Sequence, residues 1–108
     1  MNHLPGFELV SAGLADLKRR VLSPNAYLVA VGAPRLRRLG IDVPVDVPEQ
    51  PELALYRELR DLEGDAAHGS YLALVRRLES FERALERELR GQTGPVRPRL
   101  GDGTPADR

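Results

Sequence analysis

The chain has 108 residues, 42% of them apolar and 30% charged, and its 16 basic and 16 acidic side chains cancel to zero net charge. Such a chain forms one small domain, and this composition is typical of a soluble globular protein. The absence of cysteine excludes disulfides and thiolate chemistry, and with only His3 and His68 as imidazoles we expect no metal and no cofactor.

The N-terminal segment predicts two helices. Apolar residues at positions 10, 14, 17 and 21 have the spacing of an amphipathic helix, which we expect from Phe7 to about Leu22. Ser23 and Pro24 are typical of an N-cap and the first residue of a helix, so a second helix is expected over residues 24–32.

The stretch after this second helix predicts a break and a short third helix. Proline disfavours the helical conformation of the residue before it, so Pro34 is expected to restart the chain after Gly32. The third helix is expected over 34–39, with Leu36 facing the core and Gly40 as a left-handed stop.

Residues 41–51 predict an extended, proline-rich strap, because prolines at 44, 48 and 51 prevent a regular helix. Alternation of apolar and polar residues places Ile41, Val43, Val45 and Val47 on one side, and no sheet partner is evident.

The rest of the domain predicts a helical hairpin. One helix is expected over 51–63, ending at Gly64, and a long one from about residues 66–70 to Arg90, with Asp65 as N-cap and Gly91 as stop. Their short connection favours antiparallel packing. The fold class is therefore all-α, with about five helices over residues 1–91, while residues 92–108 lack periodicity and are expected to be disordered.

A concentration of positive charge lies in the first third of the chain. Residues 17–41 contain six cations and no acid, whereas residues 42–65 contain eight acids and two arginines. The cations are expected to contact either nucleic acid or an acidic partner; they are Lys18, Arg19, Arg20, Arg35, Arg37 and Arg38. The alternative is that they form a solvated face or pair with the acidic segment within the chain.

The long helix suggests a partner-binding face. It is longer than the helix it pairs with, so the C-terminal part of its apolar stripe needs either the N-terminal helices or another subunit to cover it. The residues of this hypothetical interface are Tyr71, Leu78, Phe81, Leu85 and Leu89.

Acid–base chemistry has one candidate. Asp65, His68 and Tyr71 follow one another at three-residue spacing, but no nucleophile, oxyanion stabiliser or phosphate-binding loop accompanies them. A histidine near a helix start is more often a surface or capping residue, so we do not expect an enzyme.

These patterns predict a small interaction or regulatory protein that binds a protein partner or a second copy of itself through the exposed apolar part of its helical hairpin. The alternative is a nucleic-acid-binding regulator, an antitoxin-like repressor, that uses residues 18–38. The longest apolar run is far shorter than the ~20 residues of a membrane span. No export signal is visible, so a cytoplasmic location without membrane contact is expected.

Overall fold

The computed structural model describes residues 3–93, which contain four α-helices and one short 3-10 helix. The elements are α1 (Phe7–Lys18), α2 (Pro24–Arg38), α3 (Pro51–Glu63), η1 (Gly64–Ala66) and α4 (Ala67–Thr93). No strand occurs among these residues, so the all-α class is confirmed. The predicted tail lies mostly outside the described residues, although α4 continues past Gly91.

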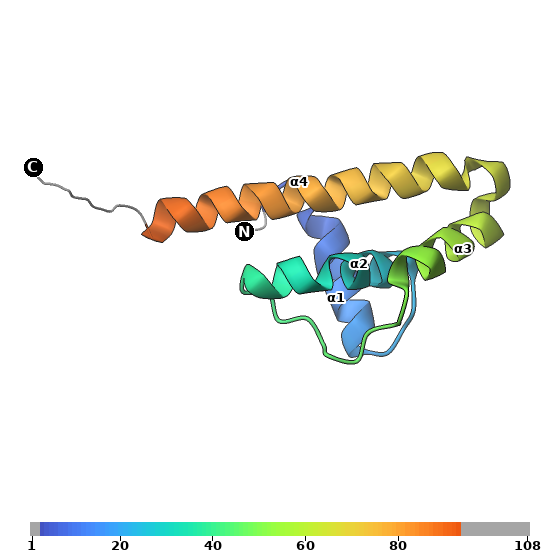
Figure 1. Cartoon of the computed structure of the whole chain (residues 1–108), viewed down its shortest axis with the longest axis horizontal. Coiled ribbons are helices and arrows are strands. Elements are labelled where there is room, and N and C mark those ends of the chain that lie inside the picture. The colour runs from blue at the N-terminus through green and yellow to red at the C-terminus, as the bar shows by residue number, and fades with distance from the viewer. Residues whose placement is uncertain (1–2, 94–108) are drawn as a thin grey trace, which may run out of the picture.

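Helices α2 and α4 organise the fold, because each of them contacts the other three α-helices. In Figure 1, α3 turns back through η1 into α4, and α1 crosses α2 at a steep angle. The N-terminal half of α4 lies along α3 and its C-terminal half lies along α2. The antiparallel hairpin is therefore present, and its longer arm covers the N-terminal helices.

The predicted break at Gly32 and Pro34 is wrong, because α2 runs without interruption through both residues. A proline inside a helix removes one hydrogen bond and costs about 3 kcal/mol, which tertiary packing must offset. Ala30, Ala33 and Leu36 around it are buried in the core. Burial on both sides of the proline holds the last turn of α2 in helical conformation.

The predicted start of α2 is confirmed in detail. Ser23 Oγ accepts a hydrogen bond from the backbone N–H of Ala26 at 3.1 Å, and Pro24 follows as the first helical residue. The same hydroxyl donates to Asp16 of α1 at 2.6 Å. This donation and that of Arg19 hold the pKa of Asp16 below its usual value. These hydrogen bonds connect the α1–α2 turn to both helices. Helix α1 ends at Lys18, whereas the sequence predicted that it would continue to about Leu22.

The strap follows the expected course except at Val45. Val43 is buried, and Ile41 and Val47 are partly buried against the core, but Val45 is 91% exposed. The guanidinium of Arg37 donates to the carbonyl oxygens of Val43 at 3.3 Å and Pro44 at 2.5 Å. These bonds hold the chain at the bend after Val43 and interrupt the alternation.

The crossing of α1 and α2 is unusually close. A Cβ atom on Gly13 would overlap the carbonyl oxygen of Asn25 and Cγ2 of Val29, and Val29 is fully buried. Backbone atoms cannot move aside as a flexible side chain can. Gly13 therefore does more than weaken α1, since it allows the two helices to touch.

We predict that Gly13→Ala lowers the free energy of unfolding by about 1–3 kcal/mol, because the added methyl group overpacks the helix crossing. Gly69→Ala is the matched control. Gly69 lies in α4 with no atom within 4 Å of an added Cβ, so alanine should stabilise the helix by about 0.5–1 kcal/mol. Urea unfolding measures both changes. Equal effects of the two substitutions would contradict this account of Gly13.

Candidate functional site

A buried carboxylate lies where α2 and α4 meet. Glu82 is 4% exposed and is the one charged residue buried among those described. Glu82 lies one helical turn after Leu78. A Cβ atom added to Gly32 would lie 2.9 Å from a side-chain atom of Glu82 and 2.9 Å from a side-chain atom of Leu78. Because Gly32 has no side chain, the Glu82 side chain can pack against α2 at this position, which explains the glycine inside α2.

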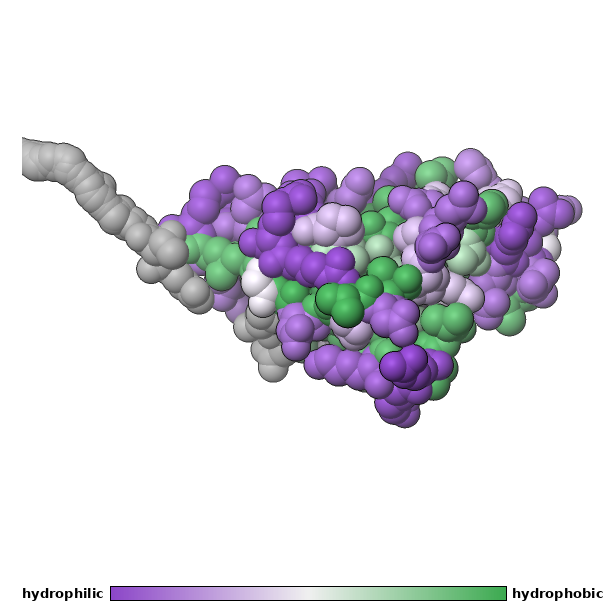
Figure 2. All heavy atoms as spheres, turned by 60° about the horizontal axis from the view of Figure 1, so that its bottom comes forward, coloured by the Kyte–Doolittle hydropathy of each residue, from purple (hydrophilic) through white to green (hydrophobic). Residues whose placement is uncertain are grey.

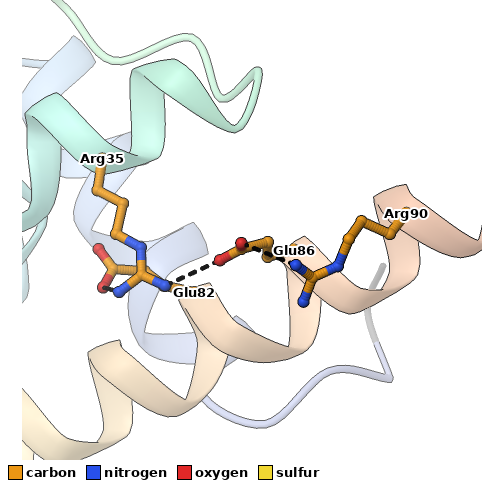
Figure 3. Close-up of polar contacts among 4 residues, drawn as sticks. All are labelled: Arg35, Glu82, Glu86 and Arg90. Carbon is orange, nitrogen blue, oxygen red and sulfur yellow. Dashed lines mark hydrogen bonds and ion pairs between the residues drawn. The ribbon is translucent and has the colours of Figure 1, made fainter.

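Arg35 partners this carboxylate and links it to a second one. Its guanidinium donates to Glu82 Oε1 at 3.4 Å and to Glu86 Oε1 at 3.1 Å, and Arg90 donates to Glu86 Oε2 at 3.3 Å (Figure 3). The side chains come from one face of α4 and from the last turns of α2. Together they form an interhelical ion-pair network of alternating charge.

The burial of Glu82 disfavours its ionisation. Burial raises the pKa of Glu82 above the usual range of a glutamate, and the positive charges of Arg35 and Arg38 oppose that rise. Removing a charge from water costs several kcal/mol, and an ion pair at 3.4 Å recovers only part of that cost.

The hollow beside this network has a volume of about 260 Å³ and an open, mixed lining. Val31 and Val75 contribute apolar surface to the lining. Arg38 and Glu79, together with Arg35 and Glu82 of the network, contribute its charged groups. Its acids and bases neutralise one another, and no nucleophile accompanies them. No group of three potential metal ligands exists among the described residues. The network joins α2 to α4 through Arg35 and its two glutamates.

The structure disperses the six cations of the predicted contact surface. Arg35 belongs to the network just described, Arg37 holds the strap, and Arg19 pairs with Asp16 at 2.6 Å. Arg20 pairs with Asp46 of the strap at 3.2 Å. Within the described part of the chain, only Lys18 and Arg38 of the six make no hydrogen bond or ion pair.

The predicted partner face on α4 is mostly core. Leu78, Phe81 and Leu85 are each at most 3% exposed, because α1 and α2 cover the C-terminal half of the helix. Tyr71 and Leu89 are partly buried and also pack against the core. The side chains at 78, 81 and 85 are thus unavailable to a partner in this fold, and any apolar contact surface must lie elsewhere.

Exposed leucines lie instead on the hairpin. Leu53 and Leu62 of α3 are 43% and 64% exposed, and Leu72 of α4 is 39% exposed. Leu62 continues the buried stripe of Leu55 and Leu59 into the last turn of α3, where its side chain is largely exposed. The sequence signal that could have located Leu62 is the apolar stripe of this helix, which continues into its last turn before Gly64.

His68 is exposed at the start of α4 and forms no hydrogen bond or ion pair within the described residues. Asp65 lies in η1, and the Tyr71 ring turns toward Tyr56 with a centroid distance of 5.9 Å. The three residues therefore show no acid–base arrangement. Next to them, the Ser70 hydroxyl donates to Glu63 and ties the helical turn together.

Comparisons with protein families, with curated proteins and with solved structures find no match to this chain. Among the described helices, none is both long and apolar enough to cross a membrane. Function must therefore be argued from the surfaces of the molecule.

We predict that Glu82→Gln gains stability relative to the wild-type chain as the pH rises from about 4 to 7. The pKa of Glu82 is raised on folding, so its contribution to stability is full below the unfolded-state pKa and declines as the pH rises through the folded-state pKa. Glutamine keeps the shape and removes this titration, and Glu86 still pairs with Arg35.

Urea unfolding at several pH values measures this difference. Glu86→Gln is the control, because its side chain is 40% exposed and should show no such gain. A relative loss of stability for Glu82→Gln with rising pH would mean that attraction to Arg35 outweighs burial.

Proposed function

We propose that this protein is a small, non-enzymatic interaction protein that self-associates through its α3–α4 hairpin. The observation that carries the proposal is the exposure of Leu62 and Leu72, on the two arms of the hairpin. Each arm of the hairpin thus offers one large exposed apolar side chain to a second copy.

The hairpin is only half of a stable packing unit. In Figure 1, α3 and the first turns of α4 extend past α1 and α2, so neither helix covers the tip. Two antiparallel helices pack side chains between them, such as the edge-to-face pair of Tyr56 and Tyr71, which are partly buried. Their outer faces stay in water unless a second pair of helices packs on them, as in a four-helix bundle.

Charge supports an antiparallel pairing of two hairpins. Leu72, Arg76, Arg83 and Arg87 are all exposed, and their spacing places them along one face of α4. Asp61, Glu63 and Asp65 are exposed at the tip. An antiparallel, two-fold arrangement brings the acidic tip of one copy to the arginines of the other, and each contact occurs twice.

The nucleic-acid alternative has less support. Four of its six cations are engaged inside the molecule, and Arg35 and Arg37 serve the helix junction and the strap. Lys18, Arg38 and the exposed Arg20 remain accessible, and three cations are too few for the phosphate contacts that dominate such binding.

We predict that Leu62→Glu and Leu72→Glu each raise the dimer dissociation constant by about 100-fold or more. Each substitution places two charges, one from each copy, at leucine positions that dimer formation would bury. Sedimentation equilibrium of the full chain measures the dissociation constant. Val45→Glu is the matched control, since Val45 is 91% exposed but lies in the strap, away from the hairpin. A wild-type chain that stays monomeric at millimolar concentration would exclude self-association.

A further inference from the structure

Arg20 has a backbone conformation that its residue type disfavours. Helices α1 and α2 end in the same hydrogen-bonded motif. At the end of α1, the backbone N–H of Arg20 donates to Leu17 O and that of Val21 donates to Asp16 O. At the end of α2, the backbone N–H of Gly40 donates to Arg37 O and that of Ile41 donates to Leu36 O. The residue after the cap is Gly40 in α2, with φ of 92°, and Arg20 in α1, with φ of 61°. Glycine is the usual residue at this position, so arginine there is strained.

The visible contact of the Arg20 side chain does not explain this choice. Its guanidinium pairs with Asp46 at 3.2 Å, but the two side chains are 84% and 77% exposed. An ion pair so open to water contributes little to stability. The strain at Arg20 therefore points to a use of its guanidinium outside the folded chain itself.

Arg20 and Asp46 bridge a groove between the end of α1 and the strap. A hollow of about 280 Å³ has Leu17, Leu22, Val47 and Pro48 in its lining. A second hollow, of about 250 Å³, adds Lys18 and Pro44, and both hollows share Leu17 and the Arg20–Asp46 pair. We call these two hollows the strap groove.

Exposed apolar side chains border the strap groove. Val21 and Leu22 are 46% and 52% exposed in the α1–α2 turn, and Val45 stands next to Asp46 in the strap. Figure 2 turns the strap side toward the viewer and shows apolar side chains gathered near the middle of this face, with hydrophilic side chains around them.

We propose that the strap groove binds an acidic peptide segment of a partner protein. An apolar side chain of the peptide packs on Leu17, Leu22 and Val47. One carboxylate of the peptide binds Arg20 and displaces Asp46. Another binds Lys18, which has no partner within the described part of the chain. Arg19 is not needed, since Asp16 engages it.

The lining favours a peptide over a nucleic acid. Leucine, valine and proline side chains offer apolar contact that a phosphate backbone cannot use. An acidic peptide with an apolar side chain satisfies both halves of the groove. This proposal is independent of self-association through the hairpin.

Fluorescence anisotropy of the full chain with a labelled peptide tests the proposal. The probe has two leucines flanked on each side by two glutamates, and the matched peptide has glutamine in place of each glutamate. We expect the acidic peptide to bind and the glutamine peptide to bind at least about tenfold more weakly.

Two substitutions separate binding from folding. Arg20→Gly should raise the dissociation constant of the acidic peptide by about tenfold or more. The melting temperature should stay equal or rise, because glycine relieves the left-handed strain. Asp46→Asn should tighten binding by about threefold or more, since it removes the competing carboxylate. Arg57→Gln, exposed on α3 away from the groove, is the control and should change neither value.

Equal binding of the two peptides, no binding of the acidic peptide, or an unchanged affinity for Arg20→Gly would overturn the proposal. So would weaker binding by Asp46→Asn. Binding of a short DNA duplex at low salt, lost in Arg20→Gly while the peptide does not bind, would assign the surface to nucleic acid instead.

Discussion

The fold depends on how closely α2 approaches α1 and α4. Gly13 lets α1 lie directly on the backbone of α2, and Gly32 lets Leu78 and Glu82 of α4 reach α2 from another direction. Because the helices are this close, small side chains such as Ala26 and Ala33 fill the space between them and are almost fully buried. A domain with few aromatic residues obtains a dense core in this way, through short distances between helices rather than through large side chains.

The close junction of α2 and α4 also determines where positive charge is used. Once Glu82 is buried there, Arg35 must stay beside it, because a buried carboxylate without a partner would cost several kcal/mol. Arg37 is used in a similar way, since its guanidinium satisfies two carbonyl oxygens of a strap that has no sheet partner. A cluster of arginines that resembles a nucleic-acid contact in sequence thus serves mainly to join parts of one small molecule.

Local rules predicted much of this fold. The Ser23 cap, the glycine stop at Gly40 and the hairpin depend on short-range geometry, and each is present. The continuation of α2 through Pro34 was not predictable, because burial on both sides of the proline arises only after α1 and α4 have packed. For the same reason sequence could not decide what covers Phe81, and the candidate contact surface moved to other residues.

The length and continuity of α4 constrain any assembly built on the hairpin. Its 27 residues form one helix about 40 Å long, and α4 contacts both the hairpin arm and the helices beneath the strap. Two copies joined at their hairpins would hold their two strap grooves at a fixed separation. A partner with two acidic segments spaced to match would then bind the second segment at high effective concentration, so avidity would depend on the spacing of those segments more than on the affinity of either one.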